Sequence, residues 1–397
     1  MGSQRHRLLL AAIIASIVHA CEIPGPLGRS DQPIVPAPYE SSVERNPDLL
    51  DLPVDRWVKI HEQKSTDPVT FRRQPHGGSA FDSRRGRLVL FGSDTHGEDW
   101  TNSPLFFSML ALAWSRLYEN DPPSTYAING EGLPVAGEKR DHPWAMHTFG
   151  AVEYDSWNDA LIVSSYPGHL EPGRFTDALA EQWPRIRRHP TWRLDLATGR
   201  WEPLPGEAVH FFPYATAYDS DRGMVIGYRS DGVYELAGNP PEWTQVAEDG
   251  FLRYHNNAVY DGRYRALVVF GSSGNSNDVV VYEPATGGHW IMPTPGPRPP
   301  PDQHTPMAYH RDAGVTVVLV DRAREKGRTD DRSKMEAETW LYDLGQDSWT
   351  RVATATLPFG LGMNYNMEYD PGHGLLMLVT DAPGGATSVW ALRLGRR

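Results

Sequence analysis

Alternating apolar and polar residues recur along the chain in short runs, each followed by a turn and a second apolar run. Two copies read SAFDSRRGRLVLFG from Ser79 and NAVYDGRYRALVVFG from Asn257. Period-two alternation on either side of a turn is typical of a β-hairpin. The phrase occurs six times, with its aromatic residue at Phe81, Tyr154, Tyr218, Tyr260, Tyr309 and Tyr369. The sequence therefore predicts six antiparallel hairpins of this kind.

A second hairpin phrase follows most of the first ones, for example TWRLDLATGRWEPL from Thr191 and TWLYDLGQDSWTRV from Thr339. Two hairpins per unit predict a four-stranded sheet. The aromatic residues of the first phrase are separated by 73, 64, 42, 49 and 60 residues, which is close to the repeat length of propeller blades that carry insertions. We therefore expect an all-β fold, a β-propeller of six four-stranded blades, with seven blades as the alternative.

The last unit ends after one outer strand, SVWALRL from Ser388. The segment RWVKI, at 56–60, has the alternation needed to supply the missing strand. Such pairing would close the ring and cover two sheet edges. In the first unit, SPLFFSMLALAWSRLY within residues 100–118 predicts a helix lying over one face. The charged run at 321–336 predicts a solvated loop.

The hairpin phrases resemble the kelch repeat. The resemblance is clearest where Trp340-Leu341-Tyr342-Asp343 is followed by a turn and Trp349, and it extends over about residues 55–397. It implies kelch-like blades, while the function of a propeller has to be argued from its site.

Composition agrees with an all-β fold. The 397 residues include 37 Gly, 34 Pro, 13 Trp and 17 Tyr, as expected for tight turns between aromatic-rich strands. Lys and Arg number 38 against 50 Asp and Glu, a net charge of -12. This balance argues against nucleic acid as a partner, because phosphate binding requires clustered positive charge. We expect a monomer.

The N-terminus has the layout of an export signal: Arg5 and Arg7, an apolar run at 8–18, and a small residue, Ala20. Cys21, the single cysteine, follows directly, and VHAC resembles a bacterial lipobox. The prediction is a lipoprotein signal peptide at 1–20, a lipidated cysteine with a Pro-rich tether at 21–54, and the propeller at 55–397. The chain would then be anchored to the cell envelope through lipid alone. The alternative is an ordinary signal peptide followed by an incidental thiol.

The segments that lead into the first hairpins are rich in histidine, and in propellers such segments gather around the central axis. His147 precedes one hairpin and His169 follows it, so antiparallel pairing returns both imidazoles to the same end of the blade. Tyr214 and Arg229 flank the next hairpin in the same way. The sequence predicts that these four groups converge on one pocket. Alternatively, such side chains cap strand ends or connect blades.

The order His147, His169, Tyr214 and Tyr228-Arg229 resembles the propeller-type ulvan lyases, over about ninety residues. The resemblance implies β-elimination at a 4-linked uronic acid, with His and Tyr as base and acid and Arg holding the carboxylate. It thus implies an acidic polysaccharide as the partner and a polysaccharide lyase as the activity.

The residue types suit this chemistry without the resemblance. Arg229 offers a bidentate guanidinium for a carboxylate. His147 or His169 can accept a proton near neutral pH, and Tyr214 can donate one or act as the base, so the two roles stay open. Candidate substrate contacts are Tyr166, Arg174, Tyr228, His255, Asn256, His76 and His304.

The sequence requires no cofactor, although the segment from Asp94 to Asp99 is rich in potential ligands. Asp94 and His96 are the candidates for a divalent metal, and His76 and His96 flank the first hairpin as His147 and His169 flank the second. A glycosidase needs two carboxylates across the sugar, and the blade entries offer His, Tyr and Asn instead. The remaining alternative is a non-catalytic kelch-type surface lipoprotein that binds glycan or protein.

Overall fold

The computed structural model describes residues 43–72, 76–97, 99–274, 276–303, 305–323, 331–363, 365–381 and 386–395. All of them belong to the second of two compact units, which begins at Ile34. This unit is all-β: the described residues form six four-stranded antiparallel sheets and one three-stranded sheet, connected by loops and short 3-10 turns. Within these ranges no helix is long and apolar enough to cross a bilayer. Cys21 and His304 lie outside the described residues.

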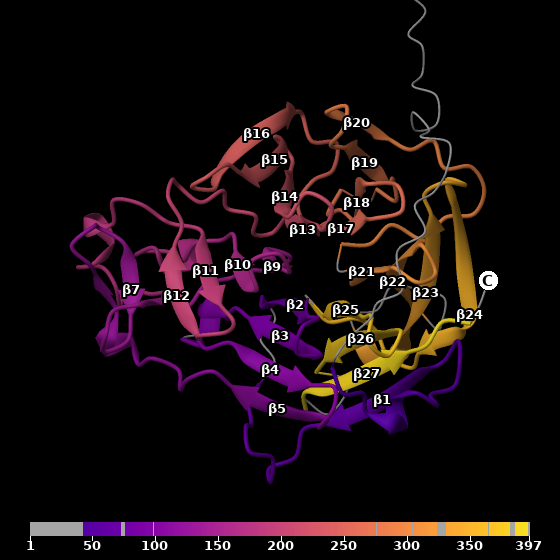
Figure 1. The fold of residues 1–397 in the computed structure, drawn as a ribbon, viewed down its shortest axis with the longest axis horizontal. Helices are drawn as coiled ribbons and strands as arrows, with labels where there is room; N and C mark the ends of the chain where they lie inside the picture. The colour runs from indigo at the N-terminus through magenta and orange to yellow at the C-terminus, as the bar shows by residue number, and fades with distance from the viewer. Residues whose placement is uncertain are drawn as a thin grey trace, which may run out of the picture. The chain divides into compact units, whose positions relative to one another are not determined.

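Each four-stranded sheet is one blade (Figure 1). Blade 1 contains β2 (Gly78–Asp82), β3 (Arg87–Phe91), β4 (Leu105–Ser108) and β5 (Ala113–Arg116). Blade 2 contains β9 (Val152–Asp155), β10 (Ala160–Val163), β11 (Trp192–Asp195) and β12 (Arg200–Pro203). Blade 3 contains β13 (Ala215–Asp219), β14 (Met224–Arg229), β15 (Gly232–Ala237) and β16 (Glu242–Glu248).

The second half of the chain repeats this order. Blade 4 contains β17 (Asn257–Asp261), β18 (Ala266–Phe270), β19 (Val280–Glu283) and β20 (Gly288–Ile291). Blade 5 contains β21 (Met307–His310), β22 (Val315–Ala323), β23 (Met335–Asp343) and β24 (Ser348–Leu357). Blade 6 contains β25 (Asn366–Asp370), β26 (Leu375–Thr380), β27 (Ser388–Leu392) and, from the N-terminal side, β1 (Trp57–Glu62).

The innermost strands form a ring. Each of β2, β9, β13, β17, β21 and β25 contacts the next, and β25 contacts β2 (Figure 1). A parallel bridge between Gly150 and Ala215 shows that the inner strands of blades 2 and 3 begin at the same end. We call this the entry end of the propeller, and the end that carries the β2–β3, β9–β10 and equivalent turns the turn end. The six-bladed propeller predicted from the sequence is confirmed.

Strand β1 completes the last blade, as the sequence predicts. It pairs antiparallel with β27, from Trp57 opposite Leu392 to Glu62 opposite Ser388. The buried Trp57 indole also donates a hydrogen bond to Thr339 Oγ1 in blade 5, at 3.0 Å. The N-terminal strand is therefore fixed to two blades.

The repeated aromatic-Asp pair has a structural cause at the turn end. Asp155 Oδ1 accepts hydrogen bonds from the backbone N–H groups of Trp157 and Asn158, which closes the hairpin turn of blade 2. The Tyr218 hydroxyl of blade 3 donates to the same Asp155 oxygen at 2.8 Å. Asp155 therefore shapes its own turn, and Tyr218 of the next blade connects the two blades. The Tyr154 hydroxyl instead donates to Asp159 in its own turn, at 3.2 Å. In blade 5, His310 Nδ1 replaces the Asp oxygen and accepts from the Ala313 N–H.

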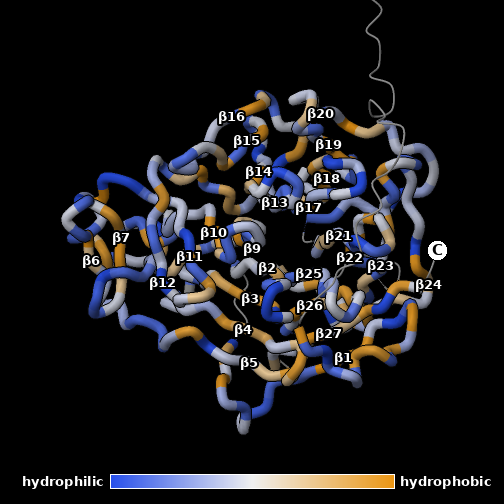
Figure 2. The backbone as a smooth tube through the Cα atoms, in the orientation of Figure 1, coloured by the Kyte–Doolittle hydropathy of each residue, from blue (hydrophilic) through white to orange (hydrophobic). Residues whose placement is uncertain are grey.

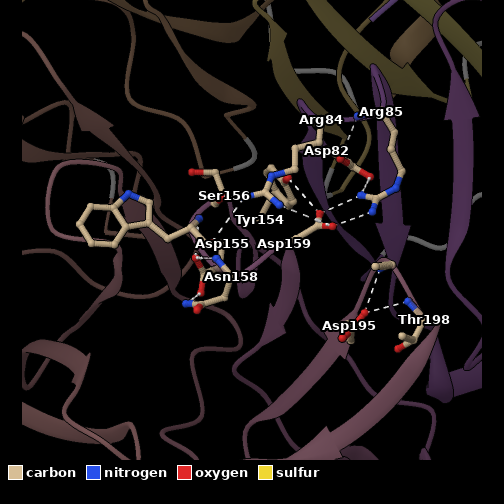
Figure 3. Close-up of polar contacts among 12 residues, drawn as sticks. Asp82, Arg84, Arg85, Tyr154, Asp155, Ser156, Asn158, Asp159, Asp195 and Thr198 are labelled. Carbon is tan, nitrogen blue, oxygen red and sulfur yellow. Dashed lines mark hydrogen bonds and ion pairs between the residues drawn. The ribbon is translucent and has the colours of Figure 1, made fainter. Parts of the chain in front are cut away.

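Blades 1 and 2 are also joined by an ion-pair network at the turn end (Figure 3). Arg85 contacts Asp159 in blade 2 at 2.6 Å and the fully buried Asp82 in its own blade at 3.0 Å. The Arg85 guanidinium lowers the pKa of the Asp159 carboxyl.

The core lies between blades. One apolar cluster joins strands of blades 5 and 6, and another joins strands of blades 1 and 2. Hydrophobic residues, orange in Figure 2, occur along these strands.

Two insertions add to the regular blades near the site. The first, between blades 1 and 2, carries η3 (Pro123–Thr125) and the three-stranded sheet of β6 (Ala127–Ile128), β7 (Pro134–Ala136) and β8 (His142–Pro143). The second follows β10 and contains η4 (Gly168–Leu170) and η5 (Trp183–Arg185). The insertions share one apolar cluster, in which Trp144 packs with Leu170 and Leu179. The second insertion is thereby held against the first.

Three sequence predictions are corrected. Residues 100–118 form no helix: they contain β4 and β5, and β4 is so fully buried that its apolar run lost the alternation of a strand. The charged run at 321–336 is partly strand, since β22 extends to Ala323 and β23 begins at Met335, with η6 (Arg332–Lys334) before it. Residues 43–54, assigned to the tether, pack on the propeller through η1 (Pro47–Leu49), where Leu49 is buried in the core of blades 1 and 6.

Candidate functional site

An open pocket of about 780 Å³ lies at the entry end of blades 2 and 3. Its wall is formed by the second insertion, by the segment that leads into β13, and by residues of β14 and β15. The lining includes Tyr166, His169, Glu171, Arg174, Trp183, His189, Glu207, His210, Phe212, Arg229 and Tyr234. The pocket therefore combines aromatic faces, three imidazoles, two guanidinium groups and two carboxylates.

Tyr166 holds two of the imidazoles in place. Its ring stacks against His210 at 3.9 Å and His189 at 4.7 Å between centroids. Burial lowers the pKa of His189 to about 4 and that of His210 to about 3. Both rings are therefore neutral at physiological pH, and each can accept a proton or a hydrogen bond.

Behind His169 the entry end carries a stack of histidines. The His169 ring lies 3.8 Å from the His147 ring, and His147 lies 4.2 Å from His76, nearly parallel at 14°. His96 lies within 5.1 Å of the other three ring centroids. Burial and the neighbouring imidazoles lower the pKa of His147, and burial lowers that of His169 to about 4.

Backbone hydrogen bonds between the segments of blades 1 and 2 position the histidines of this stack. The His76 carbonyl accepts hydrogen bonds from the N–H groups of Thr148 and Phe149, at 3.0 and 3.1 Å. The Ser93 N–H donates to the Met146 carbonyl at 2.9 Å. The segments before β2, after β3 and before β9 are thereby joined, so that His76, Asp94 and His147 share one small volume.

Arg229 is fixed at the other side of the pocket. Its Nε donates to Asp231 Oδ1 at 3.0 Å, and one terminal nitrogen donates to the His210 carbonyl at 3.2 Å. Its guanidinium lies 5.9 Å from the centroid of the Tyr214 ring, and the Tyr214 hydroxyl hydrogen-bonds with Ser230 Oγ at 2.8 Å. Arg174, which also lines the pocket, donates to the Gly168 carbonyl at 2.8 Å.

The structure brings together most of the predicted group. His147 stacks on His169 and Tyr214 adjoins Arg229, as predicted from the flanking positions, while His169, Tyr166, Arg174 and Arg229 line one pocket. The His147 side chain is 0% exposed, so His169 and not His147 faces the pocket. Tyr214 lies beside Arg229 but is itself outside the pocket lining.

Four predicted substrate contacts have other surroundings. His76 is buried in the histidine stack and is outside the pocket lining. Tyr228 is fully buried in the core of blades 3 and 4, and its hydroxyl accepts a hydrogen bond from the Leu252 N–H at 2.7 Å. Asn256 is fully buried and donates to the Arg253 carbonyl. His255 packs beside Phe149 and is outside the pocket lining. Neither Tyr228 nor Asn256 can therefore contact a substrate in this arrangement.

His189, His210, Glu207, Trp183 and Phe212 line the pocket and were missed from the sequence. A signal for one of them exists: His210-Phe211-Phe212-Pro213-Tyr214 leads directly into β13, at the entry position where histidine was expected in other blades. His189 and Trp183 belong to an irregular insertion, in which no periodicity relates sequence position to direction.

Comparison with known proteins adds no relative. No family model matches the chain, and no curated protein matches it in sequence. The likeness to kelch repeats and to ulvan lyases therefore depends on the residues described above.

Proposed function

We propose that the protein is a polysaccharide lyase that cleaves a uronic-acid-containing polysaccharide by β-elimination in the pocket between blades 2 and 3. The observation that carries this proposal is the pocket lining: an imidazole, His169, and two guanidinium groups, Arg174 and Arg229, face one open space of about 780 Å³. Trp183 and Tyr166 supply flat faces on which sugar rings can stack.

The steps follow from the chemistry of a uronate. Arg229, with Arg174 opposite, pairs with the carboxylate, which makes the adjacent C5 proton more acidic. His169 accepts that proton, the C4–O bond breaks, and a C4–C5 double bond forms. Tyr214, beside Arg229, donates its proton to the departing glycosidic oxygen. His147 touches no substrate and acts as a positioning residue, because its ring supports that of His169.

A second activity is favoured by one observation. Glu171 and Glu207 both line the pocket, and a pair of carboxylates is what glycoside hydrolysis uses. Glu207 already accepts a hydrogen bond from the His189 N–H at 3.1 Å. Hydrolysis yields new reducing ends without an unsaturated product, so the two activities are separable in one assay.

The test is a product assay with the purified full chain on ulvan, alginate, glycosaminoglycans, pectins and bacterial exopolysaccharides. We expect ultraviolet absorbance of an unsaturated uronate on at least one substrate. His169→Ala and Arg229→Ala should each lower the rate by about 10²–10³-fold, as for loss of one group that stabilises developing charge. Tyr214→Phe should lower it as well.

Arg265→Ala is the matched control. Arg265 is 61% exposed and pairs with Asp221 at the turn end, away from the pocket, so its rate should equal that of the parent chain. Reducing ends without absorbance would favour the hydrolase. Retained glycan binding with neither product would favour the non-catalytic binding protein.

We also propose that the chain is exported and anchored to the cell envelope by a lipid on Cys21. The Arg, apolar and small-residue layout of 1–20 supports this. Cys21→Ala should move the protein from the membrane fraction to the soluble fraction, and an unchanged distribution would contradict lipidation.

A further inference from the structure

Four side chains at the entry end of blades 1 and 2 surround one point. His76, His96 and His147 each present one ring nitrogen, and these nitrogens lie within 4.8 Å of one another. Asp94 Oδ1 lies 3.8 Å from His76 Nε2, 4.0 Å from His96 Nδ1 and 4.0 Å from His147 Nε2. One carboxylate oxygen is thus equidistant from three imidazoles that come from three separate segments.

His147 is the member of the cluster whose ring nitrogens are buried without a hydrogen-bond partner among the described residues. Its side chain is 0% exposed, and neither Nδ1 nor Nε2 has a hydrogen-bond partner among the described residues. A buried polar atom without a partner costs about 1–3 kcal/mol, and such atoms are rare in native proteins. Imidazole stacking leaves this cost in place. A ligand that accepts electrons from Nε2 removes it for that nitrogen.

The donor set fits a divalent transition metal. Three imidazole nitrogens and a carboxylate oxygen are ligands that Zn²⁺ takes at about 2.0–2.2 Å, and imidazole-rich sites also suit Co²⁺ and Ni²⁺. Adjacent ligand atoms of a tetrahedral site with such bonds lie roughly 3.3–3.5 Å apart. The distances of 3.8–4.0 Å to Asp94 need to shorten by about 0.5 Å. The separations of up to 4.8 Å between the imidazole nitrogens need to shorten by up to about 1.3 Å.

We propose that His76, Asp94, His96 and His147 bind one divalent transition metal ion, Zn²⁺ in the first place. The ion would connect blade 1, which supplies three ligands, to His147 at the start of blade 2. His169 stacks on His147, so the ion would fix the wall of the pocket from behind. The site stands on its own geometry and does not depend on lyase activity.

Metal binding is measured on the purified full chain after treatment with a chelator and dialysis. Calorimetric titration with Zn²⁺ should give one equivalent, and Co²⁺ should give visible absorbance typical of a nitrogen- and oxygen-ligated ion. Zn²⁺ should also raise the melting temperature, because it binds the native state.

Two variants decide the assignment. His96→Ala removes a ligand whose side chain is 37% exposed, so the fold should persist, and Asp94→Asn weakens the carboxylate ligand at constant size. His96→Ala should lower Zn²⁺ affinity at least about 100-fold and abolish the thermal shift, with a smaller loss for Asp94→Asn. His289→Ala is the control, because His289 hydrogen-bonds the Asp249 carbonyl at the outer edge of blade 4.

The outcomes separate this proposal from the proposed activity. Absence of stoichiometric binding by the parent chain, or equal binding by His96→Ala, would overturn the metal site even if the lyase assay succeeds. Stoichiometric, His96-dependent binding by a chain that cleaves no polysaccharide would support the metal site while the proposed activity fails.

Discussion

The two ends of the propeller use polar residues in opposite ways. At the turn end, Asp82 and Asp159 are saturated with hydrogen bonds and ion pairs from Arg85 (Figure 3). At the entry end, the imidazole of His147 is buried with neither nitrogen bonded. The Arg85 network connects two blades, whereas the nitrogens of His147 are left for a further partner, the metal ion proposed above.

The same comparison distinguishes contacts that recur in successive blades from contacts that belong to the candidate site. The turn-end contacts recur from blade to blade, since Tyr218 contacts Asp155 and Tyr260 contacts Asp221 in the preceding blades. Among the described residues, the histidine stack occurs once, between blades 1 and 2. The recurring contacts should therefore govern stability, and the unique ones should govern binding.

The largest effect on stability is expected for Asp82→Ala. Asp82 is fully buried and pairs with Arg85 and Arg87 at 3.0 and 2.8 Å, so its loss leaves two guanidinium groups without their shared partner. The free energy of unfolding should fall by about 3–5 kcal/mol, measured by chemical denaturation. Asp195→Ala, which removes only the turn caps at Ala197 and Thr198, should cost about 1 kcal/mol. Equal losses would show that the ion pairs of Asp82 stabilise the native state no more than a turn cap does.

A smaller loss is expected for Tyr218→Phe. The change deletes one hydroxyl that bonds Asp155 at 2.8 Å across two blades and leaves the ring in place. Stability should fall by about 1–2 kcal/mol, as for a hydrogen bond to a charged group. Tyr254→Phe is the control, with a ring that is 48% exposed. If both variants melt at the same temperature, the contact between blades contributes nothing.

A cavity enclosed by the innermost strands predicts that stability depends on pH. Glu153 and Glu368 line the same cavity inside the ring, and enclosure together with the charge of Glu368 raises the pKa of Glu153 to about 8. The native state then keeps a proton that the unfolded chain releases near pH 4.5. Unfolding therefore becomes easier as the pH rises through that window. Glu153→Gln should match the parent at pH 4 and melt about 1–3 °C higher at pH 9.

The control for this effect is Glu119→Gln, because the Glu119 side chain is 90% exposed and is paired with Arg116. Its melting temperature relative to the parent should not increase with pH. A Glu153→Gln variant without any gain at high pH would show that the Glu153 carboxyl titrates normally inside the ring.

The smallest effect is expected for His147→Leu in the metal-free chain. The imidazole has no hydrogen-bond partner within the described ranges, so an apolar side chain of similar volume should change the free energy of unfolding by less than about 1 kcal/mol. The comparison with Asp82→Ala, by the same denaturation experiment, tests the contrast between the two ends directly. If the free energy of unfolding falls by several kcal/mol, packing of the His147 ring is by itself required for stability.

Much of the fold could be predicted because each hairpin carries its own pattern. Alternation, the aromatic-Asp pair and the turn all act within about fifteen residues, and the incomplete last blade indicated the role of Trp57–Glu62. The helix expected at 100–118 was wrong because β4 is buried on both faces, and a continuous apolar run fits a buried strand or a buried helix equally.

The site was predictable where it depends on strand pairing. His147 and His169 flank one hairpin, so their proximity follows from antiparallel geometry. Tyr228 could have been excluded by the same rule, because it precedes Arg229 in β14 and neighbouring residues point to opposite faces. His189 could not be placed, since its ring is positioned by contacts with Trp183 and Tyr166 and not by strand pairing.

The pairing of β1 with β27 has a consequence for synthesis. More than 300 residues separate the two strands, so at ordinary translation rates β1 waits on the order of tens of seconds for its partner to leave the ribosome. During that time its amphipathic segment and the open side of the nascent blade array are available to other chains. The ring can become complete only when β27 emerges, so the emergence of β27 is the step that commits the propeller to its native state.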